Sequence, residues 1–155
     1  MFSFRTTPLD QQPDIVLAKG NVGVLCNQVA WNPEKGEYLF ETLHRKGNLR
    51  KVFVPGDELG GFTALSLQGV EFFPMEDMVE NILHVENLAG LDAIIVELQE
   101  IGARYSPIID LMAALFTTIY INGLEISVYV LDRENPTGRC VEGTTGALGI
   151  PHRHG

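Results

Sequence analysis

The chain has 155 residues, 45% of them hydrophobic, so it can bury one sizeable core, and its length fits a single domain spanning residues 1–155. Twenty acidic residues against eleven basic ones give a net charge of −9. That charge repels phosphate backbones and anionic lipid surfaces, which argues against nucleic acid and membrane surfaces as partners.

The first fourteen residues are polar and contain proline, so we expect an irregular N-terminus over residues 1–14. They lack the apolar core of a signal peptide. The sequence as written therefore predicts a cytoplasmic protein, or a periplasmic or secreted one if a leader has been removed. The longest apolar stretch, residues 108–121, is interrupted by Asp110 and is shorter than the roughly 20 residues of a membrane span, so we expect a buried helix and no membrane insertion.

Four apolar runs rich in Val, Ile or Leu predict buried strands, because each is closed by turn residues. They cover residues 22–27, 51–54, 93–98 and 127–131. Helices are expected between them. The first covers residues 37–46 and ends at Gly47, and the third begins at Ser106 with Pro107 in its first turn and stops at Asn122 and Gly123. The second is predicted from apolar residues at helical spacing between Pro74 and Gly90, namely Met75, Met78, Val79, Ile82 and Leu83.

Alternating strands and helices imply βαβ units and a mostly parallel sheet. The fold class is therefore α/β, a three-layer Rossmann-like arrangement. The third helix is almost continuously apolar and should be covered on several sides. After Arg133 no strand or helix period is clear, so we expect loop or extended structure there.

Motifs for cofactors are missing from the positions where this fold would carry them. The first strand continues as CNQVAWNPEKG, which matches neither GxGxxG nor a Walker A loop, and no GxSxG elbow occurs. Cys26 and Cys140 are too few for a disulfide framework and are expected as two buried thiols. His152 and His154 have no adjacent carboxylate. We therefore expect neither a cofactor nor a metal.

The segment AIIVELQEIGARY, residues 93–105, joins an apolar strand directly to a polar cluster. A carboxylate at the end of a buried strand is partly desolvated unless another group pairs with it. Glu97 and Arg104 could form a structural ion pair, or the cluster could be a functional site. The segment alone leaves both interpretations open.

Polar residues follow every predicted strand, and parallel sheets bind ligands beyond the carboxyl ends of their strands, where strand order reverses. Each group also has an ordinary explanation as a turn or a solvated loop. Together they predict a shared cleft, in which crowded carboxylates influence one another's protonation. Two such groups flank the bond in glycoside hydrolysis, about 5 Å apart for retention and about 6.5 to 9.5 Å apart for inversion. The residues in question are Asn27, Gln28 and Trp31 after the first strand, Asp57 and Glu58 after the second, 97–105 after the third, and Asp132, Arg133, Asn135 and Glu142 after the fourth.

Five segments, spread over most of the chain from Val22 to Gly155, form a recognisable series: VGVLCNQVAW, VFVP, LDAIIVELQEIGARYS, VYVLDRENPTGRCVEG and GIPHRHG. In this order and spacing they resemble the N-terminal domain of the peptidoglycan exo-β-N-acetylmuramidases of glycoside hydrolase family 171, long catalogued as a domain of unknown function. The resemblance implies a Rossmann-like domain, with a second domain that helps to roof the cleft. It also implies a hydrolase of cell-wall recycling that removes terminal N-acetylmuramic acid from peptidoglycan fragments, so the expected ligand is a peptidoglycan-derived sugar or muropeptide.

The resemblance also implies roles for individual residues. Glu58 or Glu97 would be the catalytic acid, with Asp132 as the second carboxylate. Arg104 would meet the lactyl carboxylate of the sugar through a charge-assisted bond. The remaining substrate-binding residues would be Asn27, Gln99, Tyr105, Arg133, Asn135, Glu142, Arg153 and His154; further matches to the family pattern are Gly102, Pro136, Gly143 and Gly155. Glu97 and Glu100 stand where aspartates are usual.

The sequence departs from the family pattern in two places. After the second strand the family typically reads PEHG, whereas this chain reads PGDELGG, so Glu58 replaces the family glutamate only if the loop shifts by two residues. The chain also stops at HRHG, where family members continue, so the C-terminal domain is expected to be absent and the exposed apolar surface to favour self-association. Two hypotheses stay open: a hydrolase, or a truncated or degenerate non-catalytic relative that keeps the fold and muropeptide binding.

Overall fold

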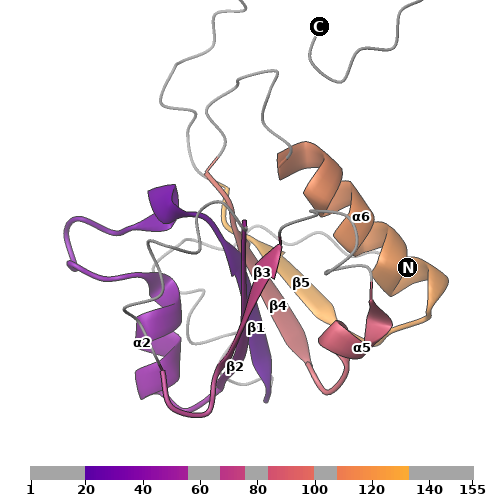
Figure 1. Ribbon diagram of the computed structural model, residues 1–155, viewed down its shortest axis with the longest axis horizontal. Helices are drawn as coiled ribbons and strands as arrows, with labels where there is room; N and C mark the ends of the chain where they lie inside the picture. The colour runs from indigo at the N-terminus through magenta and orange to yellow at the C-terminus, as the bar shows by residue number, and fades with distance from the viewer. Residues whose placement is uncertain (1–19, 56–66, 76–83, 100–107, 133–155) are drawn as a thin grey trace, which may run out of the picture.

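The computed structural model describes residues 20–55, 67–75, 84–99 and 108–132, and the structural statements below concern these residues. Figure 1 shows their helices and strands. In chain order they are β1 (Val22–Cys26), the 3₁₀ helix η1 (Gln28–Ala30), α2 (Leu39–Arg45), β2 (Leu49–Pro55), β3 (Glu71–Met75), α5 (Val85–Leu88), β4 (Ala93–Glu97), α6 (Ile108–Ile121) and β5 (Ser127–Val130).

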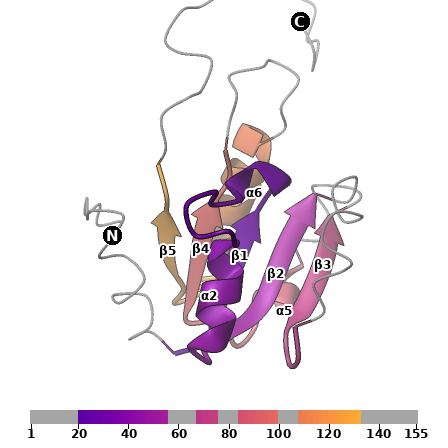
Figure 2. The same cartoon turned by 90° about the vertical axis from the view of Figure 1, so that its left-hand side faces the viewer.

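The described strands form one parallel sheet in the order β3-β2-β1-β4-β5. Helix α2 covers one face of the sheet, and α5 and α6 cover the other (Figure 1). The strands point to the same end of the sheet, as their arrowheads show in Figure 2. This confirms the three-layer α/β, Rossmann-like fold expected from the sequence.

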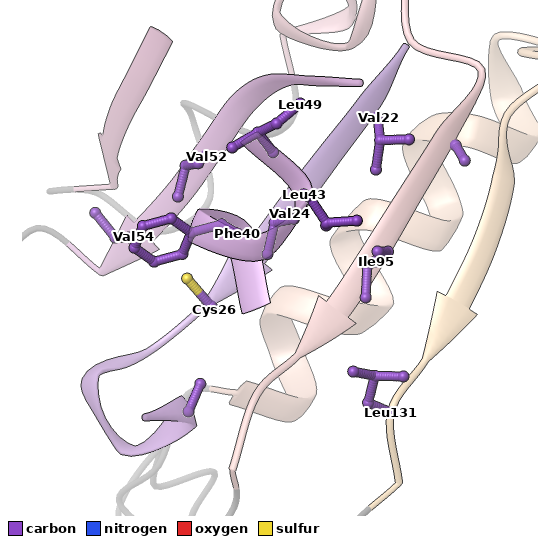
Figure 3. Close-up of a cluster of buried hydrophobic side chains, with 12 residues drawn as sticks. Val22, Val24, Cys26, Phe40, Leu43, Leu49, Val52, Val54, Ile95 and Leu131 are labelled. Carbon is purple, nitrogen blue, oxygen red and sulfur yellow. The ribbon is translucent and has the colours of Figure 1, made fainter. Parts of the chain in front are cut away.

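Both faces of the sheet are apolar, which explains why β1 and β4 are continuous hydrophobic runs rather than alternating ones. The layer between the sheet and α2 is shown in Figure 3 and contains Phe40 and Leu43 from the helix. The opposite layer packs Leu111 and Leu115 of α6 against the other side of the strands. Gly23 belongs to this packing, because a Cβ atom there would lie 2.8 Å from Cδ1 of Leu91.

Helix α2 begins two residues later than the sequence predicts. Tyr38 is its N-cap, and the Tyr38 backbone N–H donates to Oε2 of Glu41 at 2.8 Å. Glu37 is bridged to Asn32 before the helix starts. The C-terminal prediction is confirmed: Gly47 has φ +89 and its N–H donates to the carbonyls of Leu43 and His44 at 3.1 and 2.9 Å.

The ion pair between Glu37 and Arg45 gives the stability of the fold a pH dependence. Hydrogen bonds from Arg45 and then Thr42 lower the pKa of Glu37 from its ordinary 4.5 to about 2. A lowered pKa stabilises the folded chain above pH 4.5, and this contribution is lost as the pH falls through about 2. We expect Glu37→Gln to lower the urea midpoint at neutral pH. The difference in midpoint between the variant and the unmodified chain, called the gap below, should close near pH 2.

Arg45→Gln supplies the control for this prediction. It should show the same narrowing of the gap at low pH, and the double variant should be no less stable than either single variant. Because the Arg45 side chain is 61% exposed, added salt should shrink the gap at neutral pH as well. A gap that stayed constant from pH 7 to pH 2 would show that the ion pair is not its source.

The predicted helix starting at Met75 is wrong at that residue, because Met75 ends strand β3. Its partner across the sheet is Pro55. β3 is an edge strand of the described sheet, and an edge tolerates Pro74 because the missing N–H leaves no interior ladder bond unmade. Residues 76–83, the rest of the predicted helix, lie outside the described residues, and α5 is a single turn.

Helix α6 confirms the apolar helix predicted before Gly123, which has φ +59. Ser106 and Pro107 lie outside the described residues. The expected cover on several sides is wrong, because Leu111, Leu115 and Ile119 are buried whereas Ile109, Tyr120 and Ile121 are exposed. None of the helices in the described ranges combines the length and the apolar character needed to cross a bilayer.

Candidate functional site

The strand order reverses between β1 and β4, since the chain leaves β1 toward β2 on one side and β4 toward β5 on the other. In open parallel sheets the crevice at this reversal, outside the carboxyl ends of the two strands, is where ligands bind. The residues that follow β1 and β4 therefore define the candidate site. Among these residues, the contacts and burial of Asn27, Glu97 and Gln99 describe the site best.

Asn27 joins the ends of β1 and β4 through its side-chain amide. Its Nδ2 donates to the backbone carbonyl of Gln99 at 3.2 Å, and its Oδ1 accepts the Gln99 backbone N–H at 3.3 Å. The backbone ladder between the two strands ends one residue earlier, at Cys26 and Glu97. The amide thus replaces one more rung of the sheet, and we refer to this pair of bonds as the Asn27–Gln99 clasp.

The clasp needs an amide, because Asn27 must both donate and accept. Asn27→Asp keeps the shape but turns a charged oxygen toward the Gln99 carbonyl in a site where residue 27 is only 4% exposed. We expect a loss of about 1–3 kcal/mol in the free energy of unfolding, measured by urea denaturation. Asn122→Asp is the matched control, because Asn122 Nδ2 also donates to a carbonyl, that of Thr118 at 2.9 Å, but on an exposed residue where water can substitute. If Asn27→Asp and Asn122→Asp lowered the free energy of unfolding equally, the clasp would stabilise the fold no more than an exposed amide bond does.

Glu97 is the buried carboxyl group of the site, with 4% of the residue exposed. It is the register partner of Cys26, and because side chains alternate along a strand, Glu97 lies on the α2 face together with Ala93 and Ile95. Removing a carboxylate from water costs several kcal/mol unless it is paired or hydrogen-bonded. A carboxyl group placed this way is suited to hold or transfer a proton at the strand end.

Asp132 lies at the same carboxyl end of the sheet, after the neighbouring strand β5. The backbone N–H of Leu131 donates to the carbonyl of Val96 at 2.9 Å, which extends the pairing of β5 with β4 beyond Val130. The next residue, Asp132, is exposed. The structure therefore brings one buried carboxyl group, Glu97, and one exposed carboxyl group, Asp132, to adjacent strand ends.

Comparison with known proteins identifies the family. A family profile described as "Exo-beta-N-acetylmuramidase NamZ, N-terminal" matches residues 22–151. The chain belongs to this NamZ N-terminal family. A search among curated proteins gives no match.

Two solved structures of DUF1343 family proteins from Bacteroides fragilis share the fold of this NamZ N-terminal chain. One superposes with a TM-score of 0.66 at 22% identity, and the other with a TM-score of 0.57 at 17% identity. Each comparison covers 83% of this chain, but only 33% and 34% of the solved chains. This chain therefore spans about a third of the length of those relatives.

Most of the other sequence-predicted site residues of this NamZ N-terminal chain lie outside the described residues. Within the described ranges, no group of three or more His, Cys, Asp or Glu residues could hold a metal ion. The predicted site residues outside those ranges are Glu58, Arg104, Tyr105, Arg133, Asn135, Glu142, Arg153 and His154, and Cys140 and His152 lie there too.

The structure adds a contact that the sequence pattern does not indicate. The ring of Trp31 meets that of Tyr38 at a centroid distance of 5.0 Å and an interplanar angle of 76°. Tyr38 in turn stacks on the buried Phe40, with centroids 5.1 Å apart and planes at 10°. Trp31 follows η1 directly, so this aromatic row ends next to the candidate site. In the sequence, the position of Trp31 after the first strand was the only signal that associated this aromatic residue with the site.

Proposed function

We propose that this chain forms the Rossmann-like part of a glycoside hydrolase site that takes terminal β-linked N-acetylmuramic acid from peptidoglycan fragments. The single observation that carries the proposal is the buried Glu97 at the strand-order reversal of a NamZ N-terminal family member. The family description supplies the substrate, and the burial of the carboxyl group supplies the chemistry.

In the proposed reaction Glu97, in its protonated form, donates its proton to the glycosidic oxygen as the bond from that oxygen to C1 breaks. Water then adds to C1 and gives up a proton to a second carboxylate, for which Asp132 is the described candidate. The products are free N-acetylmuramic acid and the shortened fragment. Glu58 remains the proposed alternative acid.

Asn27 and Gln99 act in this proposal mainly by positioning. The clasp engages both polar atoms of the Asn27 side chain and fixes the backbone of Gln99 two residues after Glu97. The backbone of Glu97 is thereby held between a strand rung and the clasp, so the position from which its carboxyl group acts is set before substrate binds. We propose that Arg104, Tyr105, Arg133, Asn135, Glu142, Arg153 and His154 supply the direct sugar contacts.

A second candidate function is a non-catalytic relative that binds the sugar without cleaving it. The sequence PGDELGG after β2, which departs from the PEHG of the family, favours this alternative.

One experiment tests both candidate functions on the purified 155-residue chain. A chromogenic N-acetylmuramide measures hydrolysis, and calorimetric titration with N-acetylmuramic acid and a muropeptide measures binding. Release of the chromophore supports the hydrolase. Binding without release supports the non-catalytic relative, and the absence of binding and release contradicts both.

A further inference from the structure

Trp31 combines exposure with a fixed position at the candidate site. It is 42% exposed, and it lies within one turn of Asn27, since the N–H of Ala30 donates to the Asn27 carbonyl at 3.0 Å. The clasp holds Asn27 against the end of β4. The indole therefore lies beyond the carboxyl end of β1, a few residues along the chain from the strand-order reversal.

The orientation of the indole is set by the aromatic row behind it. Tyr38 meets Trp31 at a steep angle, stacks on the fully buried Phe40, and donates its hydroxyl to the Gln28 carbonyl at 3.3 Å. Phe40 makes an edge contact with Phe72 of β3 at 5.9 Å. With this contact in place, 42% of Trp31 remains exposed and open to a ligand. A large apolar ring held in place before a ligand arrives loses little conformational entropy on binding.

We propose that Trp31 is a stacking platform for the pyranose ring of the sugar, an inference that rests on the proposed function above. The face of a gluco-configured pyranose carries axial C–H groups with a slight positive charge, and these pack against the negative face of an aromatic ring. N-acetylmuramic acid has this configuration and also carries a carboxylate. In a chain of net charge −9, an uncharged indole offers contact area to an anionic sugar without adding repulsion.

Trp31 is the only tryptophan of the chain, so its fluorescence reports on the platform directly. We expect titration with N-acetylmuramic acid to shift the emission of Trp31 to shorter wavelength and to protect it from acrylamide quenching, with the same saturation curve as calorimetry. Trp31→Ala should weaken binding roughly tenfold, the size expected for loss of one aromatic contact, and Trp31→Phe should retain part of the affinity. Val29→Ala is the matched control, because Val29 is 53% exposed in the same turn but has no aromatic face.

The outcomes separate this inference from the proposed function. If calorimetry detects binding while Trp31 emission and quenching stay unchanged, or Trp31→Ala binds as tightly as the unmodified chain, the platform is overturned and the proposed function stands. If the chromophore is released although calorimetry detects no binding of N-acetylmuramic acid or muropeptide, the platform is overturned and the hydrolase stands. If neither binding nor release is detected, both are overturned. The fluorescence titration needs no variant, so it decides the question even if Trp31→Ala does not fold.

Discussion

Replacing Glu97 by glutamine is expected to lower hydrolysis of a chromogenic N-acetylmuramide by about 100- to 10,000-fold, the range typical for loss of a general acid. Glutamine keeps the size of the side chain and its hydrogen-bonding oxygen, but it has no proton to transfer to the leaving oxygen. Because glutamine has nearly the same shape as glutamate, the substitution should leave the sheet in place even though the side chain is buried on the α2 face of β4. Initial rates at several substrate concentrations, with the melting temperature of each variant, measure the effect.

Two variants make this result interpretable. Glu86→Gln is the same substitution on an exposed residue of α5 and should leave the rate unchanged. Glu97→Asp restores the acid, and also the residue usual in the family, with a shorter reach, so it should retain more activity than Glu97→Gln. If Glu97→Gln hydrolyses the substrate at the rate of the unmodified chain, Glu97 is not the acid and the assignment passes to Glu58.

Phe40→Ala is expected to cost about 3–5 kcal/mol in the free energy of unfolding, since it removes a fully buried ring and leaves a cavity. The ring lies in the layer between α2 and the sheet, where it stacks on Tyr38 and meets the edge of Phe72. A loss of this size is a large part of the stability of an ordinary domain. Urea denaturation followed by circular dichroism measures it.

Tyr120→Ala is the matched control, because it also removes an aromatic ring but from a residue that is 72% exposed. We expect a change within about 0.5 kcal/mol. If Phe40→Ala cost no more than Tyr120→Ala, the layer beneath α2 would not be the tightly packed core that its burial indicates. In the folded fraction of Phe40→Ala, Trp31 should also become more mobile, because its support through Tyr38 is lost.

The hydrophobic pattern predicts β1, β2, β4 and β5 within two residues at each end. For β1 and β4 the signal is strongest, because strands buried on both faces are continuous apolar runs. The hydrophobic pattern does not predict β3, and the reason is physical. Its sequence EFFPM contains Pro74, which a pattern-based interpretation treats as a boundary, and the edge position that tolerates a proline is known only once the sheet order is known.

The candidate site is predictable in position but not in detail. Parallel strands bring their carboxyl ends together, so the placement of Asn27, Glu97 and Asp132 along one edge follows from the fold class. The clasp does not follow, because it joins residues 72 positions apart through a side chain. The contact between Trp31 and Tyr38 has no periodic signal either, since it depends on how the chain turns between η1 and α2.

The Asn27–Gln99 clasp allows the polypeptide to change direction abruptly. A strand normally has to continue for another residue to gain another rung, but here a side chain supplies the rung and the backbone of Asn27 turns at once into η1. Insertions between Asn27 and Trp31 would lengthen this turn without unpairing the sheet. The turn at the carboxyl end of β1 could therefore vary in shape among related chains while β1 and β4 stay in register.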